Sequence, residues 1–180
     1  SSAERPYDPA MASSSPRPAQ PLLSAVVPFL NEAANLPRLI NELEQVLSPL
    51  GLDWELVLVD DGSRDEGLAV AKRELQRRPH LRATLLSLSR NFGKEAALTA
   101  GLEAARGDVV VPLDADLQDD PAEIPRMLEA LDQGADLVSG WKQTRNDPIN
   151  KRLPSKVFNW MAGKASGLEL HDLNCGFKAY

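Results

Sequence analysis

VVVPLDADLQDDP, residues 109–121, passes from an apolar run to a cluster of acidic and amide side chains within a few positions. Asp114 and Asp116 are two residues apart, so in extended backbone both side chains leave the same face and can converge on one cation. Oxygen-only ligands suit Mg²⁺ or Mn²⁺, which commonly share protein carboxylates with substrate phosphates. The alternative is a solvated acidic turn in which Asp119 or Asp120 caps the following helix.

Outward from this stretch, apolar β-branched runs alternate with amphipathic runs, which predicts βαβ units and a mainly parallel sheet in an α/β fold. We expect strands at 22–30, 54–60, 82–89, 108–113 and 135–140, and helices at 36–47, 66–77, 94–105 and from about Pro121. In open α/β sheets, ligands bind at the carboxyl ends of the strands. Polar residues follow four of these predicted strands: Asn31, Glu32, Asp60, Asp61, Arg90, Asn91, Lys94, Asp114 and Asp116.

The composition fits one globular domain with a substantial core. The chain has 180 residues, 43% of them hydrophobic, and a formal net charge of -6. Residues 1–21 are rich in Ser, Pro and Ala and lack the apolar region of a signal peptide, so we expect a disordered tail. The longest apolar stretch, 22–30, is shorter than the ~20 residues that span a bilayer. One cysteine, Cys175, excludes an internal disulfide.

The segment LVLVDDGSRD, residues 56–65, ends a predicted strand in two carboxylates and a Gly-Ser turn. An acidic residue at such a strand end can bind the base or ribose of a nucleotide, a role that suits Asp60. The alternative is an Asx-type turn that caps the next helix. Both interpretations can hold at once, with Asp61 or Ser63 capping the helix while Asp60 binds.

Five motifs occur in one order: VVPFLNEAANLP (26–37), VDDGS (59–63), LSRNFGKEAAL (88–98), DADLQDDP (114–121) and DLNCGFKAY (172–180). Together they resemble family 2 glycosyltransferases of the GT-A fold, and most closely the polyprenyl-phosphate glycosyltransferases related to dolichol-phosphate mannose synthase. The resemblance implies a Rossmann-like three-layer sandwich with a mainly parallel central sheet. It also implies one catalytic domain over 22–180, a UDP- or GDP-linked sugar donor and a Mg²⁺ or Mn²⁺ cofactor.

Carried onto this chain, the resemblance assigns residues to the donor site. Asp60 would contact the base or ribose, and Lys94 would lie near the donor. For Lys94 the alternative is a solvated lysine in the first turn of a helix. The nucleotide-sugar pocket would also include Pro28, Asn31, Glu32 and Asp114, and the metal ligands would be Asp114, Asp116 and Gln118.

Residues 141–164 differ in charge from the rest of the chain, because six basic residues against one acid give this segment a net charge of +5. Aromatic and aliphatic side chains lie among the bases, as in a helix on an anionic membrane surface. The alternative is an ordinary amphipathic helix with its aromatic residues in the core. The segment resembles the acceptor region of the subgroup, and a guanidinium group matches phosphate oxygens. This makes Arg145, Arg152 and Ser155 candidates for binding the acceptor phosphate.

The last motif contains Asp172, which matches the position of a general base in transferases that act on hydroxyl groups. A phosphate acceptor is already anionic at neutral pH, so Asp172 would then orient rather than deprotonate it. His171 has no second histidine or cysteine at metal spacing, which favours a structural or solvated role. Cys175 has no visible catalytic partner and is expected to be a small buried residue.

The sequence and the resemblance together predict an inverting, metal-dependent glycosyltransferase. It would transfer a sugar from a nucleoside diphosphate to dolichyl or undecaprenyl phosphate, in cell-envelope or glycan biosynthesis. Asp116, Arg152 and Asp172 would carry the catalysis. We expect work at the cytoplasmic face of a membrane, no nucleic-acid partner, and a C-terminal membrane region that this chain does not include.

Two alternatives remain from the sequence. The first keeps the fold but transfers the sugar to a glycan hydroxyl, which would make Asp172 an essential base. The second is a non-catalytic, receiver-like signalling module, suggested by paired acids after a buried strand. The Asp-X-Asp run would have no role in such a module.

Overall fold

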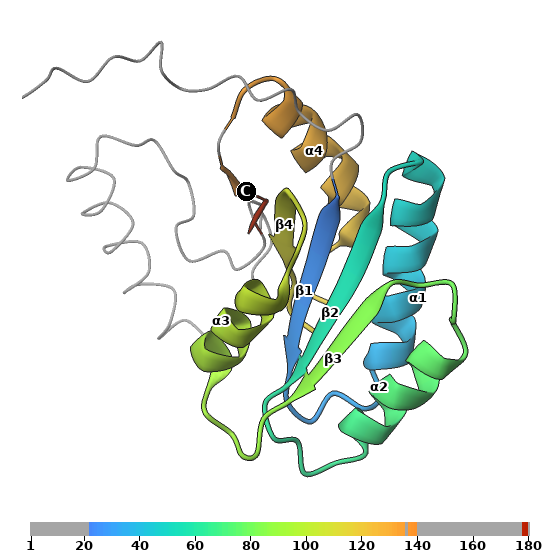
Figure 1. Cartoon of the computed structure of the whole chain (residues 1–180), viewed down its shortest axis with the longest axis vertical. Coiled ribbons are helices and arrows are strands. Elements are labelled where there is room, and N and C mark those ends of the chain that lie inside the picture. Colours follow the sequence, from blue (N-terminus) through green and yellow to red (C-terminus); the bar gives the residue numbers. More distant parts are fainter. Residues whose placement is uncertain (1–21, 136, 140–177, 180) are drawn as a thin grey trace, which may run out of the picture.

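The computed structural model describes residues 22–135, 137–139 and 178–179. Its centre is a four-stranded sheet with the strand order β3-β2-β1-β4 (Figure 1). The strands are β1 (Leu23–Phe29), β2 (Trp54–Asp60), β3 (Ala83–Ser87) and β4 (Val109–Pro112). Every neighbouring pair is parallel, so the carboxyl ends of all four strands meet at one edge. The predicted α/β fold with a mainly parallel sheet is confirmed.

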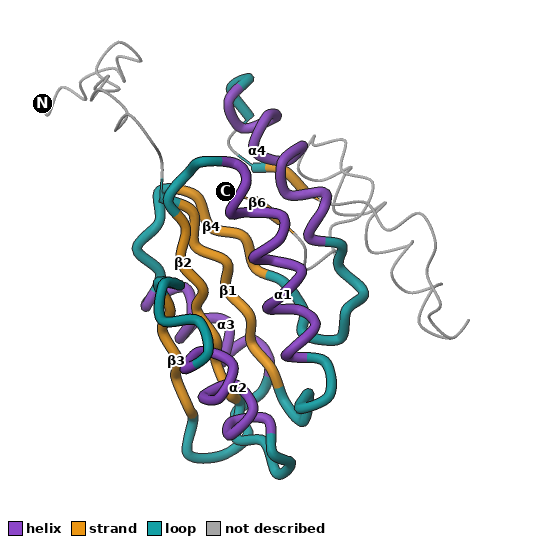
Figure 2. Tube along the Cα trace, turned by 90° about the vertical axis from the view of Figure 1, so that its right-hand side faces the viewer, coloured by secondary structure: helices purple, strands orange, loops and turns teal. Residues whose placement is uncertain are grey.

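Helices cover both faces of this sheet. They are α1 (Leu36–Leu47), α2 (Gly67–Gln76), α3 (Lys94–Ala104) and α4 (Ile124–Asp132). The helices α1 and α2 lie on one face and α3 lies on the other, which makes three layers (Figures 1 and 2). One short 3₁₀ turn, Ser48–Leu50, follows α1, and another, Pro121–Glu123, precedes α4. Each of the four helices lies where the sequence predicts a helix, α1 and α4 from the spacing of their apolar residues and α3 from its Ala-rich composition.

The core is divided by the sheet into two layers because successive side chains of a strand point to opposite faces. Ala25 and Val27 of β1 face the side of α1, whereas Val26 belongs to the cluster on the side of α3. The apolar residues of α1 recur every three or four positions and therefore form one face, which is fully buried. They are Leu36, Leu39, Ile40, Leu43 and Leu47.

Helix α3 packs closely on the sheet because its inner residues are small. Ala97 is fully buried, and Gly101 faces β1 and β2. A Cβ atom at Gly101 would lie 2.5 Å from Cγ1 of Val26, closer than such atoms approach, and 3.1 Å from Cγ2 of Val59, a tight contact. The Ala-rich sequence thus sets the distance between α3 and the sheet.

A second, two-stranded sheet joins residues that are far apart in the sequence. Strand β5 (Val138–Ser139) pairs antiparallel with β6 (Lys178–Ala179). The strand expected at 135–140 is confirmed in position but is shorter than expected. Strand β6 was not predicted, because a two-residue strand gives no periodicity to recognise. Ala179 is fully buried in the main core, so β6 belongs to the same domain.

An ion cluster centred on Arg78 links α1 to the end of α2. The Arg78 guanidinium contacts Glu44 at 2.9 Å and Glu74 at 2.6 Å, and His80 contacts the same Glu44 carboxylate at 2.5 Å. The hydrogen bond from His80, together with the charge of Arg78, lowers the pKa of Glu44 below its ordinary value. The hydrogen bond from Arg78 likewise lowers the pKa of Glu74, which is buried.

We expect Arg78→Met to lower the free energy of unfolding at pH 7 by about 1–3 kcal/mol, because two carboxylates each lose one of two basic partners. Glu74 keeps Arg77 at 2.8 Å, and Glu44 keeps His80. The folded-state pKa of Glu44 and of Glu74 lies below the unfolded value. Their contribution is therefore complete above the unfolded pKa and is lost as the pH falls through the folded pKa.

The difference between Arg78→Met and wild type should consequently shrink below about pH 4. Urea unfolding at pH 7 and at pH 3 measures it. Arg73→Met is a matched control, because Arg73 lies in the last turn of α2, just before Arg78, and makes no ion pair with the residues described. An equal loss of stability at both pH values would contradict this account.

Candidate active site

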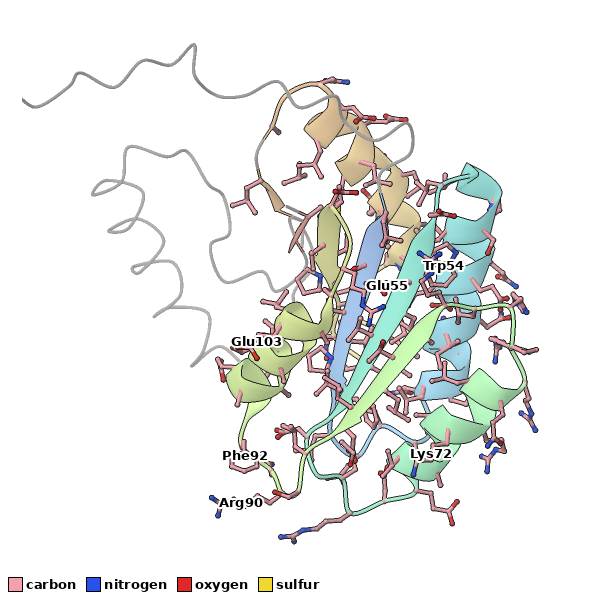
Figure 3. The ribbon with its side chains drawn as sticks, viewed as in Figure 1. Trp54, Glu55, Lys72, Arg90, Phe92 and Glu103 are labelled. Carbon is pink, nitrogen blue, oxygen red and sulfur yellow. The ribbon has the colours of Figure 1, made fainter. Side chains whose placement is uncertain are left out.

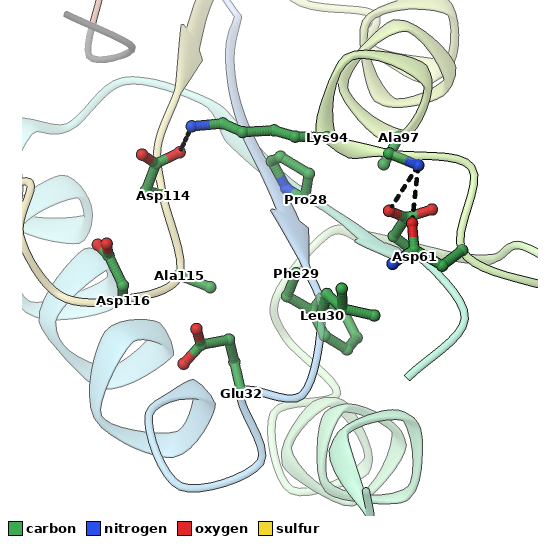
Figure 4. A pocket seen from close by; sticks show the side chains of 12 residues that line it. Pro28, Phe29, Leu30, Glu32, Asp61, Lys94, Ala97, Asp114, Ala115 and Asp116 are labelled. Atoms are coloured by element: carbon green, nitrogen blue, oxygen red, sulfur yellow. Dashed lines mark hydrogen bonds and ion pairs between the residues drawn. The ribbon is translucent and has the colours of Figure 1, made fainter. Parts of the chain in front are cut away.

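A cavity of about 290 Å³ lies at the carboxyl edge of the sheet. The chain continues from β1 to β2 and β3 on one side, whereas β4 lies on the other side of β1, so the strand order reverses between β1 and β4. Ligands bind at such a switch point in open α/β sheets. The residues around the cavity (Figure 4) are Pro28, Phe29, Leu30, Glu32, Asp61, Asn91, Gly93, Lys94, Ala97, Asp114, Ala115 and Asp116.

Asp114 and Asp116 both line this cavity, as the Asp-X-Asp spacing predicts. Asp114 is part-buried and Asp116 is exposed. The turn that carries them is shaped by other acidic groups. The Asp114 backbone N–H donates to Asp119 at 3.0 Å, and Asp120 accepts from the Ala122 N–H at the start of the 3₁₀ turn. Asp120 thus caps the 3₁₀ turn, as the alternative interpretation expects, while Asp114 and Asp116 line the cavity and their binding of a cation stays a prediction.

Lys94 lies at the first position of α3 and reaches across the cavity to Asp114 (Figure 4). Its Nζ atom is 2.5 Å from Oδ1 of Asp114. The lysine side chain is 53% exposed and the aspartate side chain 25% exposed. Lys94 is therefore more than a solvated lysine of the first helical turn, because it forms an ion pair with a candidate metal ligand.

Asp61 is the site residue that the sequence analysis undervalued. It is 3% exposed, and its carboxylate accepts hydrogen bonds from the N–H groups of Phe92 at 2.8 Å and Gly93 at 3.0 Å. These bonds fix the loop between β3 and α3, which delivers Lys94 to the cavity. Asp61 was expected at the ligand-binding edge and as a cap of the next helix; the cap is wrong, because the N-cap residue of α2 is Glu66. The pairing of Asp61 with a loop about thirty residues away has no local signal in the sequence.

Asp60 has different surroundings from those expected of a cleft residue. It is 2% exposed, and its carboxylate accepts from the Ser63 N–H at 2.9 Å and from the Ser87 hydroxyl at 3.2 Å. An Asx-type turn is therefore present, but the expected capping of the next helix is wrong, because the N-cap residue of α2 is Glu66, whose own side chain makes no capping hydrogen bond. Ser63 instead accepts from the Asn31 backbone N–H. Asp60 is not among the residues around the cavity, so its contact with a nucleotide stays a prediction.

Pro28, near the end of β1, and Glu32, in the loop after β1, both line the cavity. Asn31 instead joins two loops. The Asn31 side-chain oxygen accepts from the Arg64 backbone N–H at 2.8 Å, and the Asn31 backbone N–H donates to the Ser63 hydroxyl at 2.9 Å. Asn31 has a positive φ of 58°, a conformation that asparagine tolerates better than most residues. We interpret Asn31 as a residue that positions Glu32.

The loop before α3 carries an exposed aromatic side chain and a cation. Phe92 is 51% exposed, and the Arg90 guanidinium lies 4.8 Å from the centre of its ring. Figure 3 shows both side chains on the loop before α3, at the carboxyl edge of the sheet. This pair stiffens a loop whose backbone is already held by Asp61.

The donor set at this edge suits a hard divalent cation. Asp114 and Asp116 present carboxylate oxygens to the cavity. Proteins commonly bind Mg²⁺ in this way, through one or two carboxylates together with substrate phosphates. Gln118 is exposed, and its backbone N–H donates to Asp116, so its role as a ligand stays a prediction. Within the residues described, no three His, Cys, Asp or Glu side chains form a metal cluster by themselves.

Several predicted site residues lie outside the described part of the chain. They are the acceptor-phosphate candidates Arg145, Arg152 and Ser155 and the general-base candidate Asp172. His171 and Cys175, which were expected to have no role in the site, also lie outside the described residues.

Solved structures define the class to which this fold belongs. A mannosyltransferase from Pyrobaculum calidifontis, solved with GDP-Man and Mn²⁺, is 28% identical with a TM-score of 0.62 over 73% of this chain and 39% of that chain. Glucosyl-3-phosphoglycerate synthase from Mycobacterium tuberculosis, solved with Mn²⁺, UDP-Glc and phosphoglyceric acid, is 26% identical with a TM-score of 0.67 over 88% of this chain and 56% of that chain. The architecture is that of the GT-A glycosyltransferases.

Residues 24–179 match the model of glycosyl transferase family 2, and the chain belongs to this family. It is 41% identical to the undecaprenyl-phosphate 4-deoxy-4-formamido-L-arabinose transferase of Pseudomonas paraeruginosa, over 88% of this chain and 47% of that protein. The enzyme of the same name from Edwardsiella ictaluri is 39% identical over 88% of this chain and 48% of that protein. The chain thus spans about half the length of these curated relatives. The family match removes the receiver-like alternative.

We expect Asp61→Ala to release the loop between β3 and α3, because two backbone N–H groups lose a buried charged acceptor. The cost should be about 1–3 kcal/mol in the free energy of unfolding. Hydrogen exchange should accelerate at Phe92 and Gly93 before the rest of the domain changes. Asp53→Ala, at an exposed carboxylate before β2, is the control. Unchanged exchange at Phe92 and Gly93 would show that Asp61 does not hold the loop.

Proposed function

We propose that this chain is the catalytic domain of an inverting glycosyltransferase that transfers a sugar from a nucleoside diphosphate to a polyprenyl phosphate at a membrane surface. The observation that carries the proposal is the cavity at the switch point, where Asp114 and Asp116 face Lys94. This combination supplies carboxylates for a divalent cation and a cation for phosphate oxygens. It occurs in a chain of glycosyl transferase family 2.

The choice of acceptor rests on the relatives. The enzymes from Pseudomonas and Edwardsiella are named as undecaprenyl-phosphate transferases, and the identity of about 40% extends over most of this chain. The choice of donor rests on the solved neighbours, which were crystallised with GDP-Man or UDP-Glc. We therefore propose a GDP- or UDP-linked sugar as the donor, with the base and the sugar selected by the shape of the loops around the cavity.

Different residues of the cavity would bind the metal, the diphosphate and the nucleotide sugar of the donor. Asp114 and Asp116 would hold Mg²⁺ or Mn²⁺, with Gln118 completing the set. A bound divalent cation would act as a Lewis acid and neutralise the departing diphosphate. The N-terminal turn of α3, which includes Lys94, faces the same cavity, and a helix N-terminus favours anionic groups. Pro28 and Glu32 would line the nucleotide and sugar.

The acceptor side of the reaction would use the basic segment at 141–164. Arg145, Arg152 and Ser155 would bind the acceptor phosphate, whose oxygen attacks the anomeric carbon from the face opposite the diphosphate. Attack from the opposite face inverts the configuration, and holding both reactants in line supplies much of the rate. A phosphate acceptor is already ionised at neutral pH, so Asp172 would orient it without removing a proton.

The site of action would be the cytoplasmic face of a membrane, where a lipid phosphate and a nucleotide sugar meet. No helix in the described part of the chain is long and apolar enough to cross a bilayer. We assign contact with the membrane to the basic, aromatic segment at 141–164, on the basis of its charge and composition.

Binding of a nucleoside diphosphate should require a divalent metal and should be largely lost in Asp116→Asn, because an amide cannot replace the missing negative charge. Calorimetric titration of UDP and GDP with and without Mn²⁺ measures this. Asp120→Asn is the matched control, since this residue belongs to the same turn but caps the 3₁₀ segment. Metal-independent, unimpaired binding by Asp116→Asn would refute the assignment.

Variants of Arg152 and Asp172 separate a phosphate acceptor from a hydroxyl acceptor. For a phosphate acceptor, Arg152→Ala should raise the acceptor KM or lower turnover while donor binding stays near normal, and Asp172→Asn should be only moderately impaired. For a hydroxyl acceptor the order reverses, since loss of a general base costs roughly 10²–10⁴-fold. The assay uses the natural protein in membranes with polyprenyl phosphate. An inactive Asp172→Asn beside an intact Arg152→Ala would exclude the lipid-phosphate acceptor.

A further inference from the structure

The cavity has an excess of negative charge that one side chain partly offsets. Among the described residues, four carboxylates line it, from Glu32, Asp61, Asp114 and Asp116, and Lys94 is the one basic residue beside them. Asp61 is already committed to two backbone N–H groups. Lys94 is directed to Asp114 in the ion pair of Figure 4. The ammonium group thus occupies the carboxylate that a divalent cation would need.

We propose that Lys94 is an exchangeable counter-ion. It neutralises Asp114 in the empty site, leaves Asp114 when a divalent cation arrives, and then binds the diphosphate of the donor. This inference rests on the proposed function, because the diphosphate is the new partner of the ammonium group. Lys94 is then a positioning residue that couples the binding of metal to the binding of nucleotide.

The exposure of the pair makes this exchange physically reasonable. An ion pair between side chains that are 53% and 25% exposed is weak, because water stabilises both groups when they separate. A buried pair would be costly to break, since it would leave an uncompensated charge. Lys94 lies in the first turn of α3, and a flexible four-carbon chain carries its ammonium group. The ammonium group can therefore move while the backbone stays fixed.

Exchange predicts opposite effects of one substitution on the two ligands. Removing the ammonium group abolishes a competitor for Asp114, so Mn²⁺ alone should bind more tightly. The same change removes a phosphate contact, so the nucleotide should gain less from the presence of Mn²⁺. By linkage, the metal must lose the same factor of coupling to the nucleotide. If Lys94 only held the loop, its removal would not tighten the binding of Mn²⁺ alone.

The test is a titration of Mn²⁺, followed by the electron paramagnetic resonance signal of the free ion, in the wild type, Lys94→Met and Lys94→Arg. Each titration is made without nucleotide and with UDP or GDP. Lys72→Met is the control, because Lys72 is an exposed lysine of α2, well away from α3 in Figure 3. Thermal unfolding verifies that each variant is folded, and Lys94→Gln serves as a second neutral variant.

We expect Lys94→Met to bind Mn²⁺ alone about 2–5-fold more tightly than the wild type, because the competing ion pair is exposed and weak. The coupling between Mn²⁺ and nucleotide should fall by a similar factor, and Lys94→Arg and Lys72→Met should resemble the wild type. Unchanged or weaker binding of Mn²⁺ by Lys94→Met, or no binding by either protein, overturns the inference. If Mn²⁺ binds but neither nucleotide binds with it, the proposed function fails, whereas the competition at Asp114 is still measured by the metal alone.

Discussion

Parallel pairing of β1 with both β2 and β4 is the constraint on which the site depends. Because β1 is central and all four strands run the same way, every strand ends at one edge, and the loops that follow must share that space. The reversal of strand order separates the loops after β1 and β4 and leaves the cavity between them. Pro28 and Asp116, nearly ninety positions apart in the sequence, therefore line one cavity.

The loops at this edge are held by side chains that accept hydrogen bonds from backbone N–H groups. Asp61 holds the loop before α3, Asn31 holds the turn after β2, and Asp65 accepts from the N–H of Ala33. Gly62 is required by the same packing, because its φ is 72° and a Cβ atom there would lie 2.4 Å from the backbone of Arg90. The site is thus built on loops that fix one another, which provides preorganisation without a long rigid element.

The sequence predicted the sheet, the four main helices and the position of the acidic pair, because periodicity and the Asp-X-Asp spacing are local signals. It could not predict partners that only the tertiary fold brings together. Glu55 lies in an apolar strand and gave no sign of its role, yet it is buried and accepts from the Ser24 hydroxyl and the Arg106 N–H. Asp60 was favoured over Asp61 for the same reason, since neighbouring carboxylates look alike until their distant partners are known.

The acidic run that follows β4 can now be divided by what neutralises each carboxylate. Asp119 and Asp120 accept backbone N–H groups, so their charges stabilise the turn itself. Asp114 depends on a lysine from another element, and Asp116 shares one backbone contact while staying exposed to the cavity. Backbone N–H groups thus bind the acids that build the turn, and Asp114 and Asp116 are left facing the cavity. The proposed cation site would follow from how this turn folds, because the acids that shape the turn also orient the remaining pair into the cavity.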